Sequence, residues 1–578
     1  MERARHCCSP TTGGVVGEQR RGLSGRGPRV RTVEIAVALV GGLLHVRPVT
    51  PGSRTEVLRR DDLSRVAELE QDRPRWVWAD TAVLAPLLLA GGVRVERCVD
   101  LRLCRTILHR RDPGGVPADP VWDAPAGVPD PARPPTLLDD LASPADLTLD
   151  RVVQQWERQQ QAVAAPTGGG GLRLLLAAES VGALIAAEMR HHGLPWDREV
   201  HDRILTAALG PRPRQGARPA VLEDLAGRIR DRAGMPSLNP DSPVDVLRAL
   251  RTLGLGVTST RKWDLVGVDH PVIEPLLEYK RLARLLAANG WTWLDSWVEP
   301  GVQGRRGRFR PDYVPGGVVT GRWATSGGGA LQLPKVVRSA VRADPGWRLV
   351  IADAAQIEPR VLAAMSGDRP LADAGRGGDL YAGLVGARVV ATRDQAKVGM
   401  LGALYGGTSG DSGMLMPRLR RAYPRAIALV EEAARAGERG GVVSTWLGRT
   451  SPPPSELWVD GQQQAGSADA DEGQGRAARQ QARVRGRFTR NFVVQGSAAE
   501  WALCWMGEIR RRIRELGSAA HLVFFLHDEV VVHAPAADAE AVAEIVREAA
   551  AAAGRLLFGE TPVDFPLTVR VAEDYAEV

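Results

Sequence analysis

The chain has 578 residues, of which 44% are hydrophobic and 25% charged. This length exceeds what one hydrophobic core supports, so we expect three or more domains, and the composition excludes wholesale disorder. Lys and Arg (75) outnumber Asp and Glu (68), which permits a polyanionic partner without requiring one. The five cysteines form no CxxC pair, so they favour neither a disulfide framework nor a zinc site and fit a reducing cytoplasm.

The first part of the chain predicts a tail followed by an α/β domain. Residues 1–30 are rich in Arg, Gly and Ser and predict a flexible tail. Short apolar runs then alternate with polar breaks up to about residue 110,. The run at 33–46 is shorter than the roughly 20 residues that span a bilayer, so we expect a strand pair and no membrane segment,. A helix is predicted at 172–191, and further helical sequence runs to about 300,.

The strongest local pattern in the sequence is a strand-like apolar segment that ends on an aspartate. The segment RLVIAD at 348–353 predicts a buried strand that ends on Asp353 and is followed by a helix with one apolar face,. The carboxyl end of a strand is a common position for a catalytic acid or a metal ligand. Taken alone, Asp353 is interpreted equally well as a helix cap.

A second acidic position lies in LVFFLHDEVVV at 522–532, which predicts a β-hairpin with His527, Asp528 and Glu529 at its bend,. Turns favour Asp, so these acids alone are typical of a solvated loop tip. Both flanks are apolar enough to be buried, however, and buried strands would hold the acids rigidly, as a metal site requires.

A third pattern is the helix predicted at 392–407, with capping-box spacing at its start and two glycines at its end,. Arg393, Lys397, Leu401 and Tyr405 recur every four residues and form a row about 18 Å long. Two cations and an aromatic ring match a nucleoside triphosphate, although an ordinary solvated helix face is the alternative. The low-complexity segment at 462–475 predicts a solvated loop,.

In this order, the three segments resemble motifs A, B and C of family A DNA polymerases. The family's DYSQIELR is similar to DAAQIEPR at 353–360, its RxxxKxxxxxxxYG to Arg393, Lys397, Tyr405 and Gly406, and its HDE to 527–529. Further matches follow in the family's order: LNPDSP (238–243), EYKRLARL (278–285), TGR (320–322), LQ (331–332), LGR (447–449) and NFVVQGSAAE (491–500). The resemblance covers about residue 185 to the end.

The resemblance implies an α+β multidomain fold, a right-hand polymerase with palm, fingers and thumb and an N-terminal RNase H-like α/β domain of the exonuclease type. The expected regions are a tail (1–30), a degenerate 3′–5′ exonuclease-like domain (31–185), a thumb (186–305), a first palm part (306–370), fingers (371–490) and a second palm part (491–578).

The resemblance also assigns roles to residues. Asp353 and Asp528 would hold two Mg²⁺ ions, with Mn²⁺ as an alternative, and Glu529 would be a supporting acid. Arg393 and Lys397 would bind the triphosphate, and Lys397 would also be the general acid for pyrophosphate. The expected nucleotide contacts further include Gln356, Glu358 as the steric gate against ribose, Leu401, Tyr405 and His527. The expected DNA contacts are Arg322, Gln332, Arg487, Asn491, Gln495 and Gly406.

Departures from the family pattern are informative. Ala354, Ala355 and Pro359 replace the usual Tyr, Ser and Leu of motif A, and Leu401 occupies a usually aromatic position. Upstream, WADTAVLAPLLLAGG at 78–92 is similar to the second exonuclease motif, with Asp80 at its acid, but no DxE precedes it. Near the third exonuclease motif, Leu176 and Ser180 stand where Tyr and Asp are expected. We therefore expect no proofreading, and we expect no 5′-nuclease domain.

The sequence predicts template-directed DNA synthesis from dNTPs on primer-template DNA, in repair or gap filling, by a cytoplasmic, nucleoid-associated monomer. The alternatives are a single-subunit RNA polymerase, a catalytically inactive DNA-binding relative and an exonuclease that only repairs ends. Glu358 argues against the first, retained Asp353, Lys397 and Asp528 against the second, and the missing exonuclease acids against the third.

Overall fold

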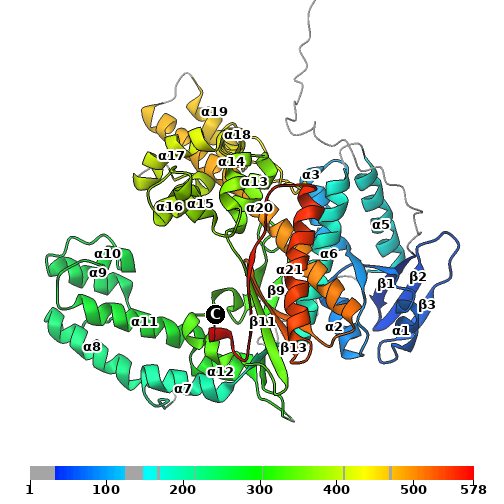
Figure 1. The fold of residues 1–578 in the computed structure, drawn as a ribbon, viewed down its shortest axis with the longest axis horizontal. Coiled ribbons are helices and arrows are strands. Elements are labelled where there is room, and N and C mark those ends of the chain that lie inside the picture. The colour runs from blue at the N-terminus through cyan, green and yellow to red at the C-terminus, as the bar shows by residue number, and fades with distance from the viewer. Residues whose placement is uncertain are drawn as a thin grey trace, which may run out of the picture.

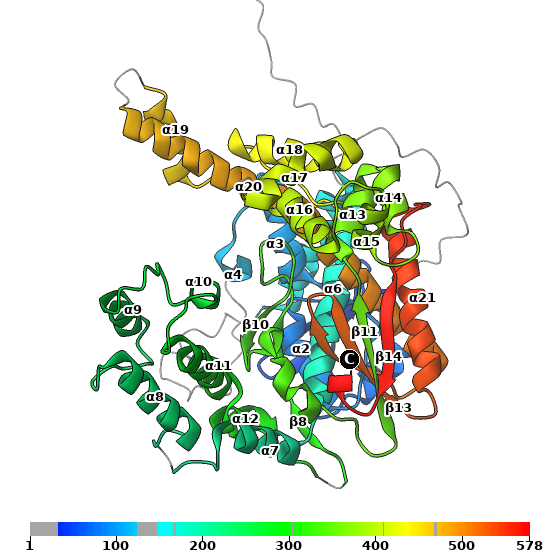
Figure 2. The same cartoon turned by 60° about the vertical axis from the view of Figure 1, so that its left-hand side comes forward.

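The computed structural model describes residues 33–123, 147–165, 169–214, 216–302, 304–407, 410–467 and 471–577. The tail predicted for 1–30 lies outside these residues. Along the chain, an α/β domain is followed by a helical arm, the first strand of a central antiparallel sheet, a second helical arm and the other three strands of that sheet. Figure 1 shows the α/β domain on the right, one helical arm on the left and the other at the top, and Figure 2 shows the same parts from the side. The predicted α+β multidomain class is confirmed.

The N-terminal domain contains a five-stranded sheet in the order β3-β2-β1-β4-β5. The strand pair predicted at 33–46 is confirmed, because β1 and β2 form an antiparallel hairpin whose turn is made by Gly41 and Gly42 at positive φ,. The strands are β1 (Glu34–Val40), β2 (Leu43–Pro48), β3 (Glu56–Arg59), β4 (Arg75–Trp78) and β5 (Arg97–Asp100). The helices are α1 (Ser64–Glu70), α2 (Thr81–Ala90), α3 (Leu101–Arg111), α4 (Pro120–Asp123), α5 (Leu149–Ala164) and α6 (Gly170–His192).

Helix α6 is the buried centre of this half of the molecule. It is the one helix in the described part of the chain that is long and apolar enough to cross a membrane, but 61% of its apolar window is buried inside the protein. It packs against α2 and β5 on one side and α20 and β12 on the other. Its apolar character is therefore that of a core helix.

The left-hand arm in Figure 1 corresponds to the predicted thumb and is almost entirely helical. The helical sequence predicted up to about residue 300 is confirmed, and its longest helix in this arm, α11, packs along α8. The arm contains α7 (Arg198–Leu209), α8 (Ala220–Ala233), α9 (Pro243–Thr252), α10 (Lys262–Leu265), α11 (Ile273–Asn289) and α12 (Trp291–Trp297). A small sheet of β6 (Leu194–Trp196), β7 (Val298–Glu299) and β8 (Gly307–Phe309) joins it to the centre.

The central sheet has four antiparallel strands in the order β12-β13-β11-β14. Both predictions for this sheet are confirmed: the strand at 348–353 is β11, and the hairpin at 522–532 is β12 and β13. The strands are β11 (Trp347–Ala354), β12 (His521–Leu526), β13 (Glu529–Pro535) and β14 (Leu567–Ala572), and α21 (Ala539–Phe558) packs against them. Short segments beside the sheet are β9 (Asp312–Val314), β10 (Ala324–Gly327), η1 (Ala330–Gln332), η2 (Lys335–Ala340) and η3 (Tyr575–Glu577).

The upper arm in Figure 1 corresponds to the predicted fingers. It contains α13 (Ile357–Ser366), α14 (Arg369–Gly375), α15 (Leu380–Gly386), α16 (Arg393–Tyr405), α17 (Gly410–Ala422), α18 (Pro424–Glu438), α19 (Glu456–Ala465) and the start of α20 (Glu472–Leu516). The loop predicted at 462–475 is wrong at both ends, where α19 ends and α20 begins. Asp471 and Gln474 form a complete capping box there, and this local stabilisation outweighs the low complexity of the segment.

Helix α20 has 45 residues and is about 67 Å long, so it runs from the upper arm into the centre of the protein. It crosses α18 at very close range. A Cβ atom at Gly437 would lie 2.1 Å from Thr489 Oγ1, and one at Gly486 would lie 2.6 Å from Glu438 Cγ. The predicted boundaries at 185/186 and 490/491 fall inside α6 and α20, so each of these helices belongs to two regions.

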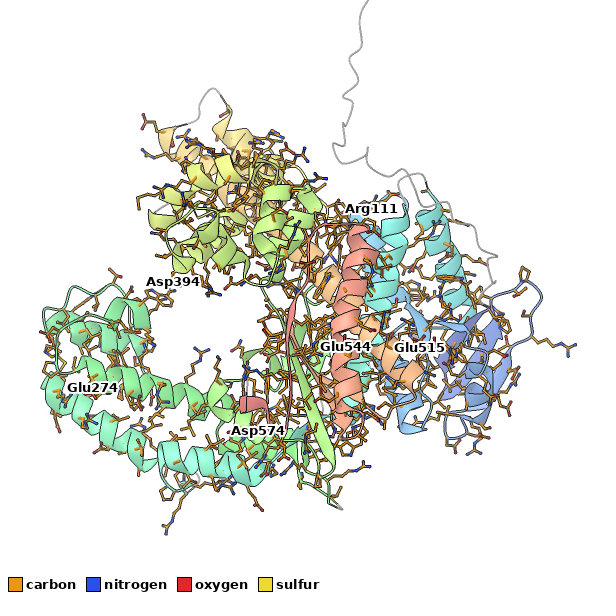
Figure 3. The ribbon with its side chains drawn as sticks, in the orientation of Figure 1. Arg111, Glu274, Asp394, Glu515, Glu544 and Asp574 are labelled. Atoms are coloured by element: carbon orange, nitrogen blue, oxygen red, sulfur yellow. The ribbon has the colours of Figure 1, made fainter. Side chains whose placement is uncertain are left out.

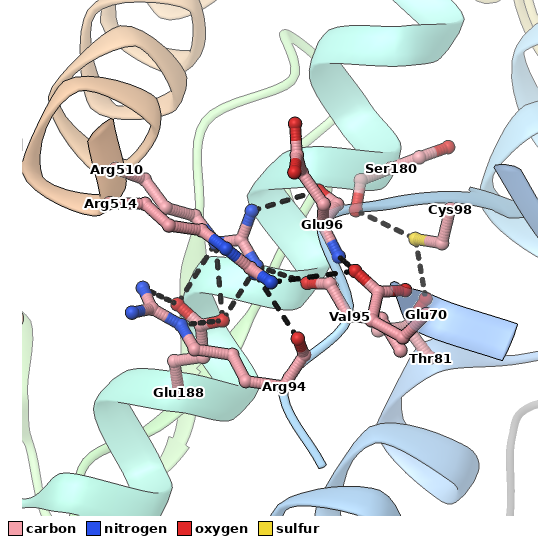
Figure 4. Close-up of polar contacts among 10 residues, drawn as sticks. All are labelled: Glu70, Thr81, Arg94, Val95, Glu96, Cys98, Ser180, Glu188, Arg510 and Arg514. Atoms are coloured by element: carbon pink, nitrogen blue, oxygen red, sulfur yellow. Dashed lines mark hydrogen bonds and ion pairs between the residues drawn. The ribbon is translucent and has the colours of Figure 1, made fainter. Parts of the chain in front are cut away.

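A buried cluster of charges joins the N-terminal domain to α20 (Figure 4). The guanidinium of Arg510 is paired with the carboxylate of Glu188 on α6 at 2.7 Å, and Arg94 binds the same carboxylate at 2.8 Å. The side chains of Arg510 and Glu188 are only 4% and 7% exposed. Burial would raise the pKa of Glu188, but the two arginines hold it well below its usual value.

The same cluster binds backbone of the N-terminal domain. Arg510 also donates to the carbonyls of Val95 and Glu96, and Arg514 donates to the carbonyl of Arg94. These carbonyls precede β5, so the ion pairs fix the edge of one domain to the long helix of another.

We expect Glu188→Ala to lower the free energy of unfolding by about 3 kcal/mol, because it leaves Arg510 buried without its partner. Urea unfolding measures this change. The matched control is Arg511→Ala, which removes a more exposed arginine from the same helix and should cost less than about 0.5 kcal/mol. Equal effects of the two variants would contradict a structural role for the cluster.

Candidate active site

The three predicted acids lie at one edge of the central sheet. The register of β11 and β13 places Asp353 directly opposite Glu529. The N–H of Ala354 donates to the carbonyl of Asp528 at 2.9 Å, so Asp528 reaches the same edge from the hairpin turn. His527 makes this turn with φ of +59°, a left-handed conformation that is uncommon for residues other than Gly. The sheet thus brings together acids that are far apart in the sequence.

Mutual repulsion and burial perturb these acids. The pKa of Asp528 is raised to about 7, first by burial and then by the carboxylates of Asp353 and Glu529. Burial also raises the pKa of Asp353, while Arg338 acts to lower it. The Nη1 atom of Arg338 lies 3.4 Å from Glu529 Oε1. Sequence reasoning missed Arg338, which lies in a short 3-10 helix without a distinctive pattern.

The donor set fits a hard divalent cation. Among the residues that the structure describes, no group of three or more His, Cys, Asp and Glu side chains is arranged to hold a metal ion. Mg²⁺ does not require such a group, because it keeps several waters and binds through one or two carboxylates plus substrate phosphates. Asp353 and Asp528 can supply two carboxylates, and their repulsion would be relieved by a positive charge between them.

A pocket of about 290 Å³ opens beside the acids. It lies between α13, α16, α20 and the hairpin of β12 and β13. Trp323, Phe525 and Met506 give it apolar walls, and Tyr381, which sequence reasoning missed, lines another side. Seven of the predicted site residues line it: Arg322, Gln356, Glu358, Leu401, Tyr405, His527 and Asp528.

Glu358 is the polar centre of this pocket. One of its carboxylate oxygens is ion-paired with Arg322, and the other accepts a hydrogen bond from the Tyr405 hydroxyl at 2.6 Å. Burial and this hydrogen bond raise the pKa of Tyr405. The three side chains come from separate parts of the chain, so the contact joins the first turn of α13 to the end of α16.

Asp379 forms a second polar centre that sequence reasoning missed. Gln356 Nε2 donates to Asp379 Oδ1 at 2.9 Å, and Arg393 Nε donates to Oδ2 at 2.6 Å. The guanidinium of Arg393 lies over the Tyr381 ring, 5.6 Å from its centroid. Asp379 is also the N-cap of α15, and a preference for Asp at that position was the available sequence signal.

The helix predicted at 392–407 is confirmed as α16. The Thr392 hydroxyl caps its start, and Gly406 ends it at φ of +75°. Arg393 and Lys397 are exposed on the helix, whereas the row that they begin ends in the pocket. The row therefore leads from solvent toward the paired acids.

The predicted nucleic-acid contacts outside the pocket lie on two elements. Arg487, Asn491 and Gln495 follow one another at four-residue spacing on α20 and form one row,. A Cβ at Gly406 would lie 2.7 Å from Arg487 Cγ, so the end of α16 packs on the stem of this arginine. Gln332 is exposed in η1.

Two acids of the N-terminal domain, Asp80 and Asp100, serve as helix caps. Asp80 caps α2, and Asp100 caps α3. On α6, Ser180 donates its hydroxyl to the carbonyl of Leu176 at 2.8 Å, so neither position supplies a carboxylate. These hydrogen bonds give Asp80, Asp100 and Ser180 structural roles that do not involve a metal ion.

A central antiparallel sheet with paired carboxylates at its edge, a pocket beside them and two helical arms match the right-hand arrangement that the resemblance implies. The arms and the sheet can accordingly be named thumb, fingers and palm. A family model agrees with the geometry: DNA polymerase family A matches residues 220–577. The chain therefore belongs to DNA polymerase family A, as the resemblance of its motifs predicted.

Curated relatives extend this result. The chain is 29% identical over 388 residues to the thermostable DNA polymerase I of Thermus filiformis, covering 61% of this chain and 43% of that protein. It is 27% identical over 368 residues to DNA polymerase I of Chloroflexus aurantiacus, covering 57% and 36%. The aligned part of the chain thus spans less than half the length of these relatives.

A solved structure shares the whole fold. The polymerase domain of Pol1 from M. smegmatis, in complex with DNA primer-template and dNTP, matches 94% of this chain and 96% of that chain with a TM-score of 0.65 at 19% sequence identity. Because the match covers nearly the whole chain, the shared fold includes the N-terminal α/β domain.

We expect the stability of the metal-free protein to fall as pH rises from about 4 to about 7, in part because of Asp528. Its pKa is about 7 when folded against 3.8 as the ordinary value, so the unfolded chain loses this proton first and ionisation opposes folding. Asp528→Asn should remove this contribution and stabilise the protein by about 1–2 kcal/mol at pH 8, but not at pH 4.

Thermal unfolding in a chelator at the two pH values measures this difference. Asp574→Asn, at an acid away from the pocket (Figure 3), is the control. A gain for Asp528→Asn that is the same at both pH values would show that ionisation is not its cause.

Proposed function

We propose that this chain is a DNA-directed DNA polymerase, a nucleotidyltransferase that adds dNTPs to the 3′-hydroxyl of a primer on a DNA template. The observation that carries the proposal is the meeting of Asp353 and Asp528 at the palm edge, beside a pocket that contains Glu358. Family membership and the fold of a relative solved with primer-template and dNTP support it.

Asp353 and Asp528 would hold two Mg²⁺ ions, with Mn²⁺ as an alternative, and Glu529 would support them while Arg338 balances its charge. When bound, such ions activate the primer hydroxyl and stabilise the leaving pyrophosphate. The rigid palm sheet keeps the two carboxylates in place, which is the contribution of the protein to this chemistry.

The α16 row would deliver the nucleotide to these acids. Arg393 binds phosphate through its planar fork, and Lys397 binds it as a compact charge and protonates the leaving pyrophosphate. Tyr405 would stack near the templating base pair and Leu401 would contact the sugar. Gln356 and His527 complete the pocket, and closure of α16 on the correct nucleotide would add selectivity.

The duplex would be held through its backbone. Arg322 and Gln332 on the palm side and the α20 row of Arg487, Asn491 and Gln495 would contact primer and template, with Gly406 leaving room at the end of α16. Such contacts position the duplex without reading its sequence. Affinity for DNA should accordingly fall steeply with salt.

The N-terminal domain would not proofread. Asp80 and Asp100 serve as helix caps, and Leu176 and Ser180 supply no carboxylate. A two-metal exonuclease site deprived of its acids cannot hold its ions. The proposed regions are the exonuclease-like domain (31–185), the thumb (186–305), the first palm part (306–370), the fingers (371–490) and the second palm part (491–578). We also retain a role in repair or gap filling for a cytoplasmic, nucleoid-associated monomer.

Primer extension tests the proposal. We expect the purified protein to extend a primer with dNTPs in Mg²⁺ and Asp528→Ala to be at least about 100-fold slower, since loss of metal-based charge stabilisation costs several kcal/mol in the transition state. Glu544→Ala, at an exposed acid on α21 (Figure 3), is the control and should extend at the wild-type rate. Equal rates for Asp528→Ala and the wild type would refute the assignment.

A second assay separates DNA synthesis from the alternative of RNA synthesis. The wild type should use dNTPs in strong preference to ribonucleotides, because Glu358 is fixed in the pocket by Arg322 and Tyr405 and crowds a 2′-hydroxyl. Glu358→Ala should raise the relative kcat/KM for ribonucleotides by about tenfold or more, which corresponds to about 1.4 kcal/mol of discrimination. Efficient ribonucleotide use by the wild type would instead favour an RNA polymerase.

A further inference from the structure

The carboxylate of Asp379 occupies the Nε side of the Arg393 guanidinium, which is one of the edges through which an arginine binds a phosphate. Arg393 Nε donates to Asp379 Oδ2 at 2.6 Å, and the two side chains are 53% and 36% exposed. An anion from solvent can therefore reach this pair. A side-on bidentate bond through Nε and a neighbouring Nη requires the anion to replace Asp379 at Nε,.

The two partners differ in how firmly they are held. Asp379 Oδ1 accepts from two backbone N–H groups at the start of α15 and from the amide of Gln356. Gln356 in turn accepts from the N–H of Leu380 at 2.8 Å. Arg393 is the first residue of α16 and is bound through the end of a long side chain. If the pair opens, Arg393 moves and the carboxylate stays.

The fixed carboxylate is also charged at neutral pH. Burial would raise the pKa of Asp379, but Arg393, the Ala382 N–H and the Gln356 amide hold it below its usual value. A phosphate that reaches Arg393 therefore meets a negative charge close by. Competition for the guanidinium acts on every polyphosphate, with or without a base, and it outweighs the direct repulsion because Asp379 contacts Arg393 itself.

We propose that Asp379 is a positioning residue that holds Arg393 while no nucleotide is bound and competes with polyphosphates for it. The inference rests on the proposed function, since it takes Arg393 as a ligand of the triphosphate. A dNTP that pairs with the template gains stacking and pairing that outweigh the competition. Free pyrophosphate gains neither, so it is bound weakly and Asp379 regains Arg393 readily when pyrophosphate leaves.

Asp379→Asn tests the competition without removing the helix cap. Asn caps a helix as well as Asp and can still accept from the Gln356 amide, but it carries no charge. On a dideoxy-terminated primer-template, we expect the Kd for the complementary dNTP to fall by about two- to fivefold, the range of an exposed ion pair. The Kd for inorganic pyrophosphate should fall by a similar factor.

Two further variants show whether the effect passes through Arg393. In an Arg393→Ala background, Asp379→Asn should change neither Kd by more than about 1.5-fold. The effect of Asp379 on binding passes through Arg393, so it is lost when that side chain is absent, whereas an independent effect would remain. The matched control is Asp394→Asn, at the exposed neighbouring acid on the lower edge of the fingers in Figure 3. It removes the same charge without a contact to the guanidinium and should change Kd less.

An unchanged or weaker dNTP affinity in Asp379→Asn would overturn the proposal. An equal gain in affinity in the Arg393→Ala background or in Asp394→Asn would also overturn it. Either result would show that the loss of any negative charge in this region strengthens binding. If the wild type bound no dNTP at all, the proposed function would fail. The pyrophosphate titration of DNA-free protein would then decide alone: equal affinities of the wild type and Asp379→Asn would overturn the role of Asp379.

Discussion

The candidate site depends above all on the register between β11 and β13. Side chains alternate between the two faces of a sheet, so a slip of one residue would turn Asp353 away from Asp528. The register is fixed farther along the same strands, where Val350 lies opposite Val532 and Ile351 opposite Val531, all fully buried. These paired, buried strands hold the two carboxylates together against their mutual repulsion.

The N-terminal domain depends on a different kind of contact. Asp80 and Asp100 cap helices, and buried ion pairs of Glu188 with Arg510 and Arg94 attach the domain to α20. Such buried charges are expensive to separate. A domain bound in this way contributes to the stability of the palm helices whatever its chemistry. This gives the described α/β fold a structural role that does not require exonuclease chemistry.

Local patterns predicted most of the elements because each was encoded within a short segment. The strand before Asp353, the hairpin around Asp528 and the cap of α16 are all stabilised by near neighbours. The meeting of the two acids was predictable only by resemblance, since periodicity cannot pair distant strands. Arg338 and Asp379 were missed because tertiary contacts alone bring them to the site. The loop at 462–475 was predicted wrongly because composition was weighed above the capping box of α20.

The close crossing of α18 and α20 ties the outer fingers to the palm. Glycine at 437 and 486 leaves no side chain between the two helices, since an added Cβ would lie 2.1 Å from Thr489 Oγ1 or 2.6 Å from Glu438 Cγ. Helix α20 continues from this crossing to Arg510, which binds Glu188 and the backbone of the N-terminal domain. A single helix therefore connects the fingers, the palm and the N-terminal domain.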